Sequence, residues 1–92
     1  MEFIIIDGKR MTTVEETHRY LERTLRLPPY YGHNLDALYD CLSDLSQNVF
    51  IILINGDSMQ ENLGEAYAQK LRTVFADASR VPFAFRFIEN PS

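Results

Sequence analysis

The chain of 92 residues has a single cysteine, no long apolar run and only isolated glycines. One cysteine cannot form an internal disulfide, and Cys41 falls on the apolar stripe of a predicted helix, as expected for a small buried side chain in a reducing compartment. No stretch approaches the ~20 apolar residues of a membrane span. The opening residues, MEFIIIDGKR, do not have the pattern of a signal peptide. We therefore expect a cytoplasmic protein without a membrane partner.

Basic residues are missing from the middle of the chain. No Lys or Arg occurs in residues 27–69, and the formal net charge of the whole chain is −4. Proteins bind nucleic acids through clustered Lys and Arg, so this charge argues against direct contact with DNA or RNA. A cationic protein is the partner that it suits. Because no glycine-rich loop is present to hold phosphates, we also expect no cofactor.

Short apolar, β-branched runs alternate with helical patterns along the chain. Strands are predicted at residues 3–6, 49–54 and 83–88. The first is predicted to be buried. The second is apolar at every position, which predicts that both of its faces are covered or nearly so. Strands that alternate with helices imply right-handed crossovers. We therefore predict one α/β domain over residues 1–92, with a small three-stranded parallel sheet.

Two capping signals locate the first and last predicted helices. The first helix begins at Thr12 or Thr13, with a glutamate three residues later, and Pro28 is expected to stop it. Ser58 with Glu61 offers a second capping box before a long amphipathic helix. The apolar stripe of that helix consists of Leu63, Tyr67, Leu71, Val74, Phe75 and Ala78.

Residues 34–45 predict a helix with one apolar face and one acidic face. Asn34 is a good N-cap, and the apolar stripe consists of Leu35, Leu38, Cys41, Leu42 and Leu45. The opposite face carries Asp36, Asp40 and Asp44. Like charges at four-residue spacing cost ~0.2–0.5 kcal/mol per pair, and Asp44 also lies near the negative end of the helix dipole. This face is either an ordinary solvated surface or a recognition surface for a basic partner.

Tyrosines flank the acidic helix. Tyr30 and Tyr31 precede it and Tyr39 lies within it. We expect Tyr31 to pack inward, and the others to combine with the acids as aromatic anchors of a protein interface. Asp77 adds a carboxylate near the C-terminal end of the last helix, where the dipole again disfavours it.

Candidates for catalysis are few. His18 lies on the apolar side of its predicted helix, which favours a packed histidine. His33 could form an acid–base pair with a neighbouring carboxylate. Cys41 faces the core in acidic surroundings, whereas a reactive thiolate needs an electropositive, accessible setting. Carboxylates along one helix face do not provide convergent metal ligands. We therefore expect neither an enzyme nor a metal site.

The run LPPYYGHNLDALYDCLSDL, at residues 27–45, closely resembles the signature segment of the barstar family, intracellular inhibitors of a secreted bacterial ribonuclease. The likeness extends to the first strand, the helix ending at Leu27-Pro28 and the VFADA run at residues 74–78. It implies a ribonuclease inhibitor with a three-stranded parallel sheet, and Asp40 as the central acid in the enzyme's phosphate site. The positions that would meet the ribonuclease are Tyr30, Asn34, Asp36, Tyr39, Asp40 and Asp77.

The chain departs from the family pattern at three places. Tyr39 stands where the family has tryptophan, and Asp77 stands where it has glutamate. Residues 46–48 lack the aromatic and small residues that complete the family's binding loop. These departures bear on which ribonuclease is recognised.

We therefore predict an inhibitor that binds a basic bacterial ribonuclease or ribonuclease toxin domain, with immunity to a toxin as one biological role. It is expected to be a monomer when free. The predicted partner-binding residues are Tyr30, Asn34, Asp36, Tyr39, Asp40, Asp44 and Asp77. The alternative is an interaction module whose acidic face docks on a basic partner that is not a nuclease. A small enzyme that uses His33 and a carboxylate is a more distant alternative.

Overall fold

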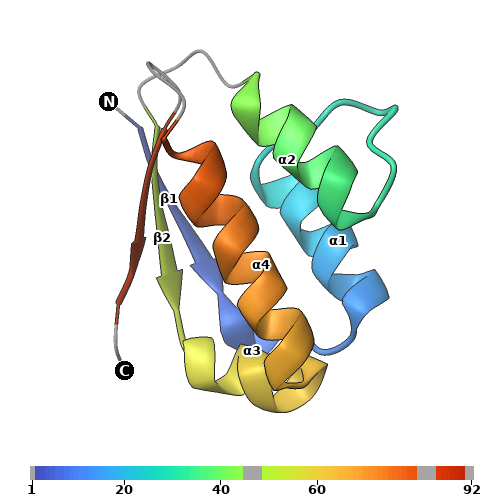
Figure 1. The fold of residues 1–92 in the computed structure, drawn as a ribbon, viewed down its shortest axis with the longest axis vertical. Helices are drawn as coiled ribbons and strands as arrows, with labels where there is room; N and C mark the ends of the chain where they lie inside the picture. Colours follow the sequence, from blue (N-terminus) through green and yellow to red (C-terminus); the bar gives the residue numbers. More distant parts are fainter. Residues whose placement is uncertain (1, 45–48, 81–84, 91–92) are drawn as a thin grey trace.

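The structure, a computed structural model, describes residues 2–44, 49–80 and 85–90. Three parallel strands form one sheet, as predicted, and β2 lies in its centre (Figure 1). The strands are β1 (Glu2–Asp7), β2 (Val49–Ile54) and β3 (Phe85–Glu89). The start of the predicted third strand, at residues 83–84, lies outside the described residues.

The connections between the strands are helical, and Figure 1 shows the helices gathered on one side of the sheet. β1 is followed by a 3-10 turn, η1 (Gly8–Arg10). The α-helices are α1 (Val14–Thr24), α2 (Leu35–Ser43), α3 (Gly56–Leu63) and α4 (Glu65–Ala78). This is the predicted α/β architecture with helical crossovers. None of the helices in the described part of the chain is long and apolar enough to cross a membrane.

The first helix ends earlier than predicted. α1 stops at Thr24 because Arg26 takes a left-handed conformation with φ of 54°. The Leu27 N–H then donates to the Glu22 carbonyl at 2.9 Å, which closes the turn that commonly terminates helices. The prediction that Pro28 stops the helix is therefore wrong, since the chain has already left the helix when it reaches the proline.

The predicted last helix is two helices. α3 begins at Gly56, directly after the left-handed Asn55, so the predicted capping box at Ser58 is not used. Gly64, with φ of 87°, then separates α3 from α4. Glycine adopts this conformation without steric cost, which explains why a continuous apolar stripe does not produce a continuous helix. After this break α4 packs against α2.

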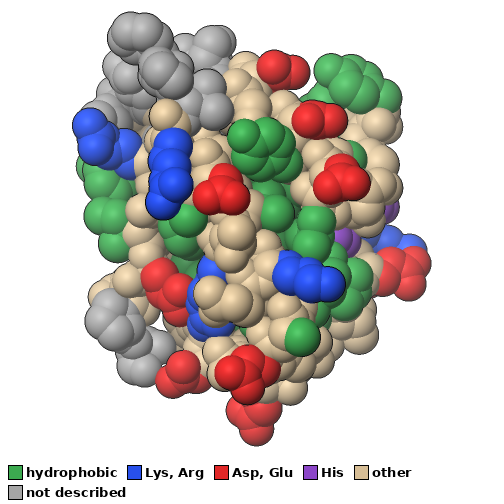
Figure 2. Space-filling view, in the orientation of Figure 1, with side chains coloured by type: hydrophobic (Ala, Val, Ile, Leu, Met, Phe, Trp, Pro, Cys, Tyr) green, Lys and Arg blue, Asp and Glu red, His purple; other side chains and the backbone are tan. Residues whose placement is uncertain are grey.

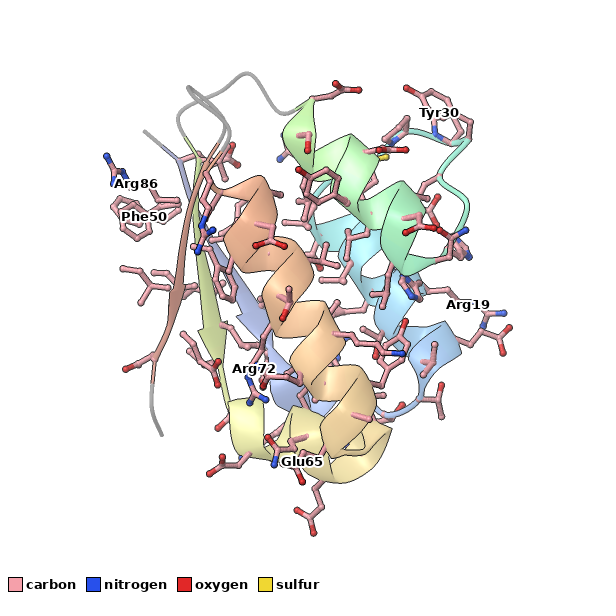
Figure 3. The ribbon with its side chains drawn as sticks, viewed as in Figure 1. Arg19, Tyr30, Phe50, Glu65, Arg72 and Arg86 are labelled. Carbon is pink, nitrogen blue, oxygen red and sulfur yellow. The ribbon has the colours of Figure 1, made fainter. Side chains whose placement is uncertain are left out.

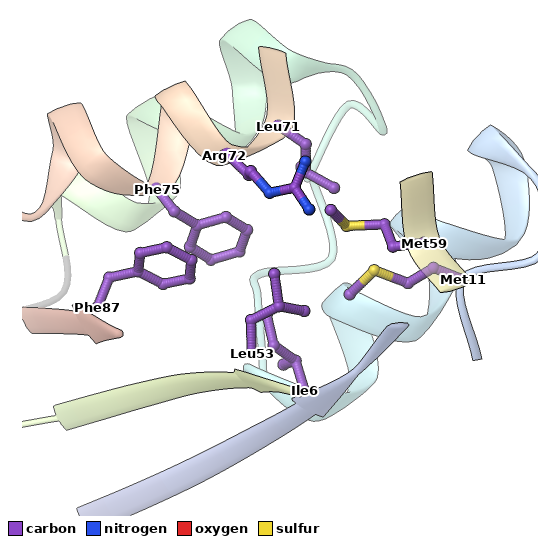
Figure 4. A pocket seen from close by; sticks show the side chains of 8 residues that line it. All are labelled: Ile6, Met11, Leu53, Met59, Leu71, Arg72, Phe75 and Phe87. Carbon is purple, nitrogen blue, oxygen red and sulfur yellow. The ribbon is translucent and has the colours of Figure 1, made fainter. Parts of the chain in front are cut away.

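The hydrophobic core lies between the helices and the inner face of the sheet. Val49, Ile51 and Leu53 supply the inner face of β2, and Phe75 of α4 stacks on Phe87 of β3 at 4.9 Å between ring centroids. Figure 4 shows the part of the core beneath α4, where the space between the side chains does not admit a water molecule. Its lining consists of Ile6, Met11, Leu53, Met59, Leu71, Arg72, Phe75 and Phe87.

A single guanidinium group joins three elements at the edge of this core. Arg72 of α4 donates from Nε and Nη2 to the Glu89 carboxylate of β3, at 2.8 and 3.0 Å. Its Nη1 donates to the side chain of Gln60 in α3 at 2.9 Å. Bidentate charge-assisted pairs of this kind are among the stronger hydrogen bonds in proteins. We call this group of contacts the Arg72 clamp.

The outer face of the sheet is only partly covered. Phe3 is 63% exposed and Ile5 is 57% exposed, while the outward-facing side chains of β2 are partly exposed. The prediction of a buried first strand is therefore wrong for this face, whereas β2, with alternating buried and partly buried side chains, agrees with the prediction that both of its faces are covered or nearly so. The first strand is exposed here because the helices lie on the other side of the sheet (Figure 1).

Candidate protein-binding surface

The start of α2 is fixed by its predicted N-cap. Asn34 Oδ1 accepts a hydrogen bond from the Ala37 N–H at 2.8 Å, and Asn34 Nδ2 donates to the Gly32 carbonyl at 3.2 Å. His33 precedes it with φ of 54°, so the chain turns sharply into the helix. Asn34 is therefore exposed and held at the edge of the acidic face.

The two faces of α2 lie as predicted from the spacing. Leu38 and Leu42 are fully buried, and Leu35 and Cys41 are partly buried against the core. Leu45 lies outside the described residues. The opposite face exposes Asp36, Asp40 and Asp44. The ion pairs between described residues involve Arg19, His33 and Arg72, so none of these three aspartates is paired within that part of the chain.

The acidic face continues onto α4 and is flanked by aromatic side chains. Asp77 is exposed in the last turn of α4, the helix that packs against α2. Tyr39 is 38% exposed on α2. Figure 2 shows acidic side chains over the upper right of the molecule, where α2 lies, with hydrophobic groups among them. Basic side chains lie toward the left edge and lower down in the same view.

The loop before α2 sends its two tyrosines in opposite directions. Tyr30 is 82% exposed and projects from the tip of the loop (Figure 3). Tyr31 is buried, as predicted, and its N–H donates to the Pro28 carbonyl at 2.9 Å. Because the buried ring holds the loop, its neighbour Tyr30 is presented to solvent beside the acidic face. We call Tyr30, Asn34, Asp36, Tyr39, Asp40, Asp44 and Asp77 the acidic surface.

A buried histidine supports this loop from below. His18 is 1% exposed, and its two ring nitrogens hydrogen-bond the hydroxyl groups of Tyr31 and of Tyr67 in α4, the latter at 2.7 Å. Burial, together with the neighbouring His33, lowers the pKa of His18. Burial raises the pKa values of both tyrosines. The position of His18 in the sequence predicts a packed histidine, which is confirmed, but nothing in the sequence indicates Tyr67 as its partner.

The other candidates for chemistry have structural contacts. His33 Nε2 hydrogen-bonds Glu22 of α1 at 2.8 Å instead of an aspartate of α2, and its ring stacks over His18 at 6.5 Å between ring centroids. Burial, with Asp44 and Asp40 nearby, raises the pKa of the Cys41 thiol, which disfavours the reactive thiolate. Across residues 2–44, 49–80 and 85–90, no three His, Cys, Asp or Glu side chains are grouped to hold a metal ion.

What the acidic surface can do chemically is bind cations. The surface has four carboxylates on two packed helices and two exposed tyrosine rings. It is complementary to a protein partner that presents Arg and Lys around an apolar contact. The segment at 46–48, where the sequence departs from the family pattern, lies outside the described residues.

Comparison with known proteins points in the same direction. The family model described as "Barstar (barnase inhibitor)" matches residues 1–87. The chain is also 38% identical over 79 residues to a protein of Bacillus subtilis (strain 168) named "Putative ribonuclease inhibitor YrdF". That match covers 85% of this chain and 86% of the Bacillus protein.

Proposed function

The chain belongs to the barstar family of ribonuclease inhibitors, and from this we propose that it inhibits a small basic ribonuclease by placing its acidic surface over the enzyme's active site. The observation that carries the proposal is the row of Asp36, Asp40 and Asp44, exposed along a rigid helix without a cationic partner among the described residues. Like charges in a row destabilise a helix, so their presence favours a binding role.

The proposed inhibition is electrostatic mimicry of the substrate. A ribonuclease must present cationic and hydrogen-bonding groups to the developing charge of a phosphodiester. Carboxylates on α2 offer the same sign of charge at a regular spacing, so they compete with RNA for those groups. In this proposal Asp40, the middle acid, enters the phosphate site, and Asp36 and Asp44 pair with cations on either side of it.

The aromatic and polar neighbours have a different role in the proposal. Tyr30 and Tyr39 are the anchors that exclude water from the contact, as buried aromatic residues do in most hot spots. Asn34 supplies hydrogen-bonding groups at the start of α2, and Asp77 extends the charged area onto α4. The buried pair of Tyr31 and His18 positions the loop and does not itself touch the enzyme.

The biological role that follows is protection of the producing cell. A cell that makes a secreted ribonuclease, or receives a ribonuclease toxin, needs an inhibitor where its own RNA is. We therefore place the protein in the cytoplasm, as the partner of a basic ribonuclease or of a ribonuclease toxin domain.

The test is a titration with measured RNA cleavage. The purified chain is added to small basic ribonucleases and toxin domains encoded in its own genome, with binding followed by calorimetry in parallel. We expect one of these enzymes to bind and to lose its activity at one chain per enzyme. Tight binding that leaves RNA cleavage intact would refute inhibition and support the alternative of a docking module for a basic partner.

A further inference from the structure

The outer face of the sheet is an apolar surface on the side opposite the helices. The strand register places side chains in two rows across it, Phe3–Phe50–Arg86 and Ile5–Ile52–Ile88. Phe3 and Phe50 stack at 5.6 Å between ring centroids. Figure 3 shows Phe50 and Arg86 on the side of the sheet that faces away from the helices.

This exposure is unusual for the kind of sheet that carries it. Parallel sheets occur almost only with both faces covered, and β2 is apolar at all six of its positions. Phe3, Ile5 and Ile88 nevertheless remain 63%, 57% and 48% exposed. The largest contiguous apolar patch on a soluble protein is often an interaction site. The outer face therefore has the properties of a surface that a second molecule covers.

We propose that a second copy of the same chain covers this face, through a two-fold axis parallel to β2. Such an axis places β1 of one copy over β3 of the other and pairs the rows. Ile5 then faces Ile88 of the other copy, and the Arg86 guanidinium faces the Phe3 ring of the other copy, an arrangement that favours a cation–π contact. The contact occurs twice, because the two-fold axis generates it from both sides.

The charges on this face favour self-association over a charged partner. Arg86 is the charged side chain of the two rows, and the other members of the rows are apolar. Within residues 2–44, 49–80 and 85–90, Arg86 forms no ion pair. The aspartates of α2 lie on a helix at the other side of the sheet (Figure 1). When two copies are joined through their outer faces, the aspartates of one copy are therefore far from those of the other. Because of this separation, repulsion between the two negatively charged chains opposes the contact only weakly.

The size of the face predicts a weak dimer. Each strand has five or six residues. At ~3.3 Å per residue and ~4.8 Å between strands, the face measures roughly 20 by 15 Å, about 300 Å² in projection. Stable interfaces bury about 800 Å² per partner. We therefore expect reversible association at high concentration, with the acidic surface of each copy free. The expectation of a monomer, made from the sequence, then holds for dilute protein.

The experiment measures mass against concentration by sedimentation equilibrium, from micromolar to millimolar protein. The wild type should approach the mass of two chains, and Ile5→Glu, which puts a carboxylate on the outer face, should remain at one chain. Val14→Glu is the matched control, because Val14 is an apolar residue 40% exposed on α1. Circular dichroism checks that each variant folds. A wild type that stays at one chain, or an Ile5→Glu that associates like the control, would overturn the proposal.

The orientation of the two copies has its own test. Phe3→Glu places a carboxylate opposite Arg86 of the other copy, so association should survive and become sensitive to salt. Adding Arg86→Glu should then abolish it. Loss of association in Phe3→Glu alone would overturn the proposed axis. The dimer does not depend on ribonuclease inhibition, so Ile5→Glu should inhibit as the wild type does, and Asp40→Asn should still associate.

Discussion

Replacing Asp40 with asparagine removes one charge and keeps the shape of the side chain. Asp40 lies between Asp36 and Asp44 on the exposed face of α2, four residues from each. A like-charge pair at this spacing costs ~0.2–0.5 kcal/mol, so removing two pairs should raise the free energy of unfolding by ~0.4–1 kcal/mol. Aspartate and asparagine have similar helix propensities, so little else should change.

The same substitution at the neighbouring acids, Asp36 and Asp44, should change the free energy of unfolding differently. Asp36→Asn removes only one repulsive pair, and it also loses the favourable interaction of a first-turn carboxylate with the helix dipole, ~0.3–1 kcal/mol. Its free energy of unfolding should therefore stay the same or fall. Asp44, the C-cap, opposes the dipole, so Asp44→Asn should be stabilising.

Binding should change in the opposite direction from stability. If Asp40 is the central acid of the interface, Asp40→Asn should weaken ribonuclease binding by at least ~2 kcal/mol, about thirtyfold in Kd. Asp57→Asn is the matched control, because Asp57 is an exposed first-turn carboxylate on α3, outside the acidic surface. It should leave affinity unchanged.

Urea unfolding and titration calorimetry on the same preparations give both quantities. A lower free energy of unfolding in Asp40→Asn would mean that the carboxylate has a structural partner, contrary to its exposed position. A loss of affinity below ~1 kcal/mol would show that Asp40 is not a hot spot. Either result would refute the view that the acids of α2 lower the stability of the protein and raise its affinity for the ribonuclease.

Three further outcomes follow from the same contacts. Association with the ribonuclease should slow steeply as salt rises while dissociation changes little, because screening acts mainly before contact; stopped-flow rates that ignore salt would contradict electrostatic steering. Because burial lowers the pKa of His18 from 6.5, the unfolded chain binds a proton that the folded chain resists, and the free energy of unfolding should fall as pH drops below that value. His18→Gln should be less stable at neutral pH and show a shallower pH dependence in urea unfolding; an unchanged slope would contradict the linkage. His33→Ala and Cys41→Ala should both still inhibit the ribonuclease, and Cys41→Ala should lower the free energy of unfolding by ~1 kcal/mol. If the wild type hydrolysed RNA, an ester or a phosphate and either substitution abolished that activity, the non-catalytic role would be refuted.

Local signals in the sequence predicted the features that depend on neighbouring residues. Thr13 caps α1 by accepting the Glu16 N–H at 3.1 Å, and Asn34 caps α2, both as the residue types suggest. The division of α2 into a buried and an acidic face follows from side chains three and four residues apart. These parts of the acidic surface could therefore be recognised without a structure.

Two of the features that were missed depend on distant parts of the chain, and a third depends on a single backbone angle. Tyr67 meets His18 across 49 residues of sequence, and nothing local to either indicates the contact. The exposed outer face arises because the helices lie on one side of the sheet, whereas the run of β2 only indicates that both faces tolerate apolar residues. The break at Gly64 depends on a backbone angle that the apolar stripe on either side does not reveal.

The Arg72 clamp limits the order in which contacts can form while the chain is synthesised. Glu89, which the clamp requires, leaves the ribosome after β1, β2 and all of α4. The ring of Phe87, against which Phe75 stacks, arrives with it. A nascent chain can therefore pair its first two strands early, but the contacts that join α4 to β3 form only after β3 emerges. Until β3 pairs, one edge of β2 remains open to other strands, so the growing chain is most exposed to wrong pairing before its third strand is in place.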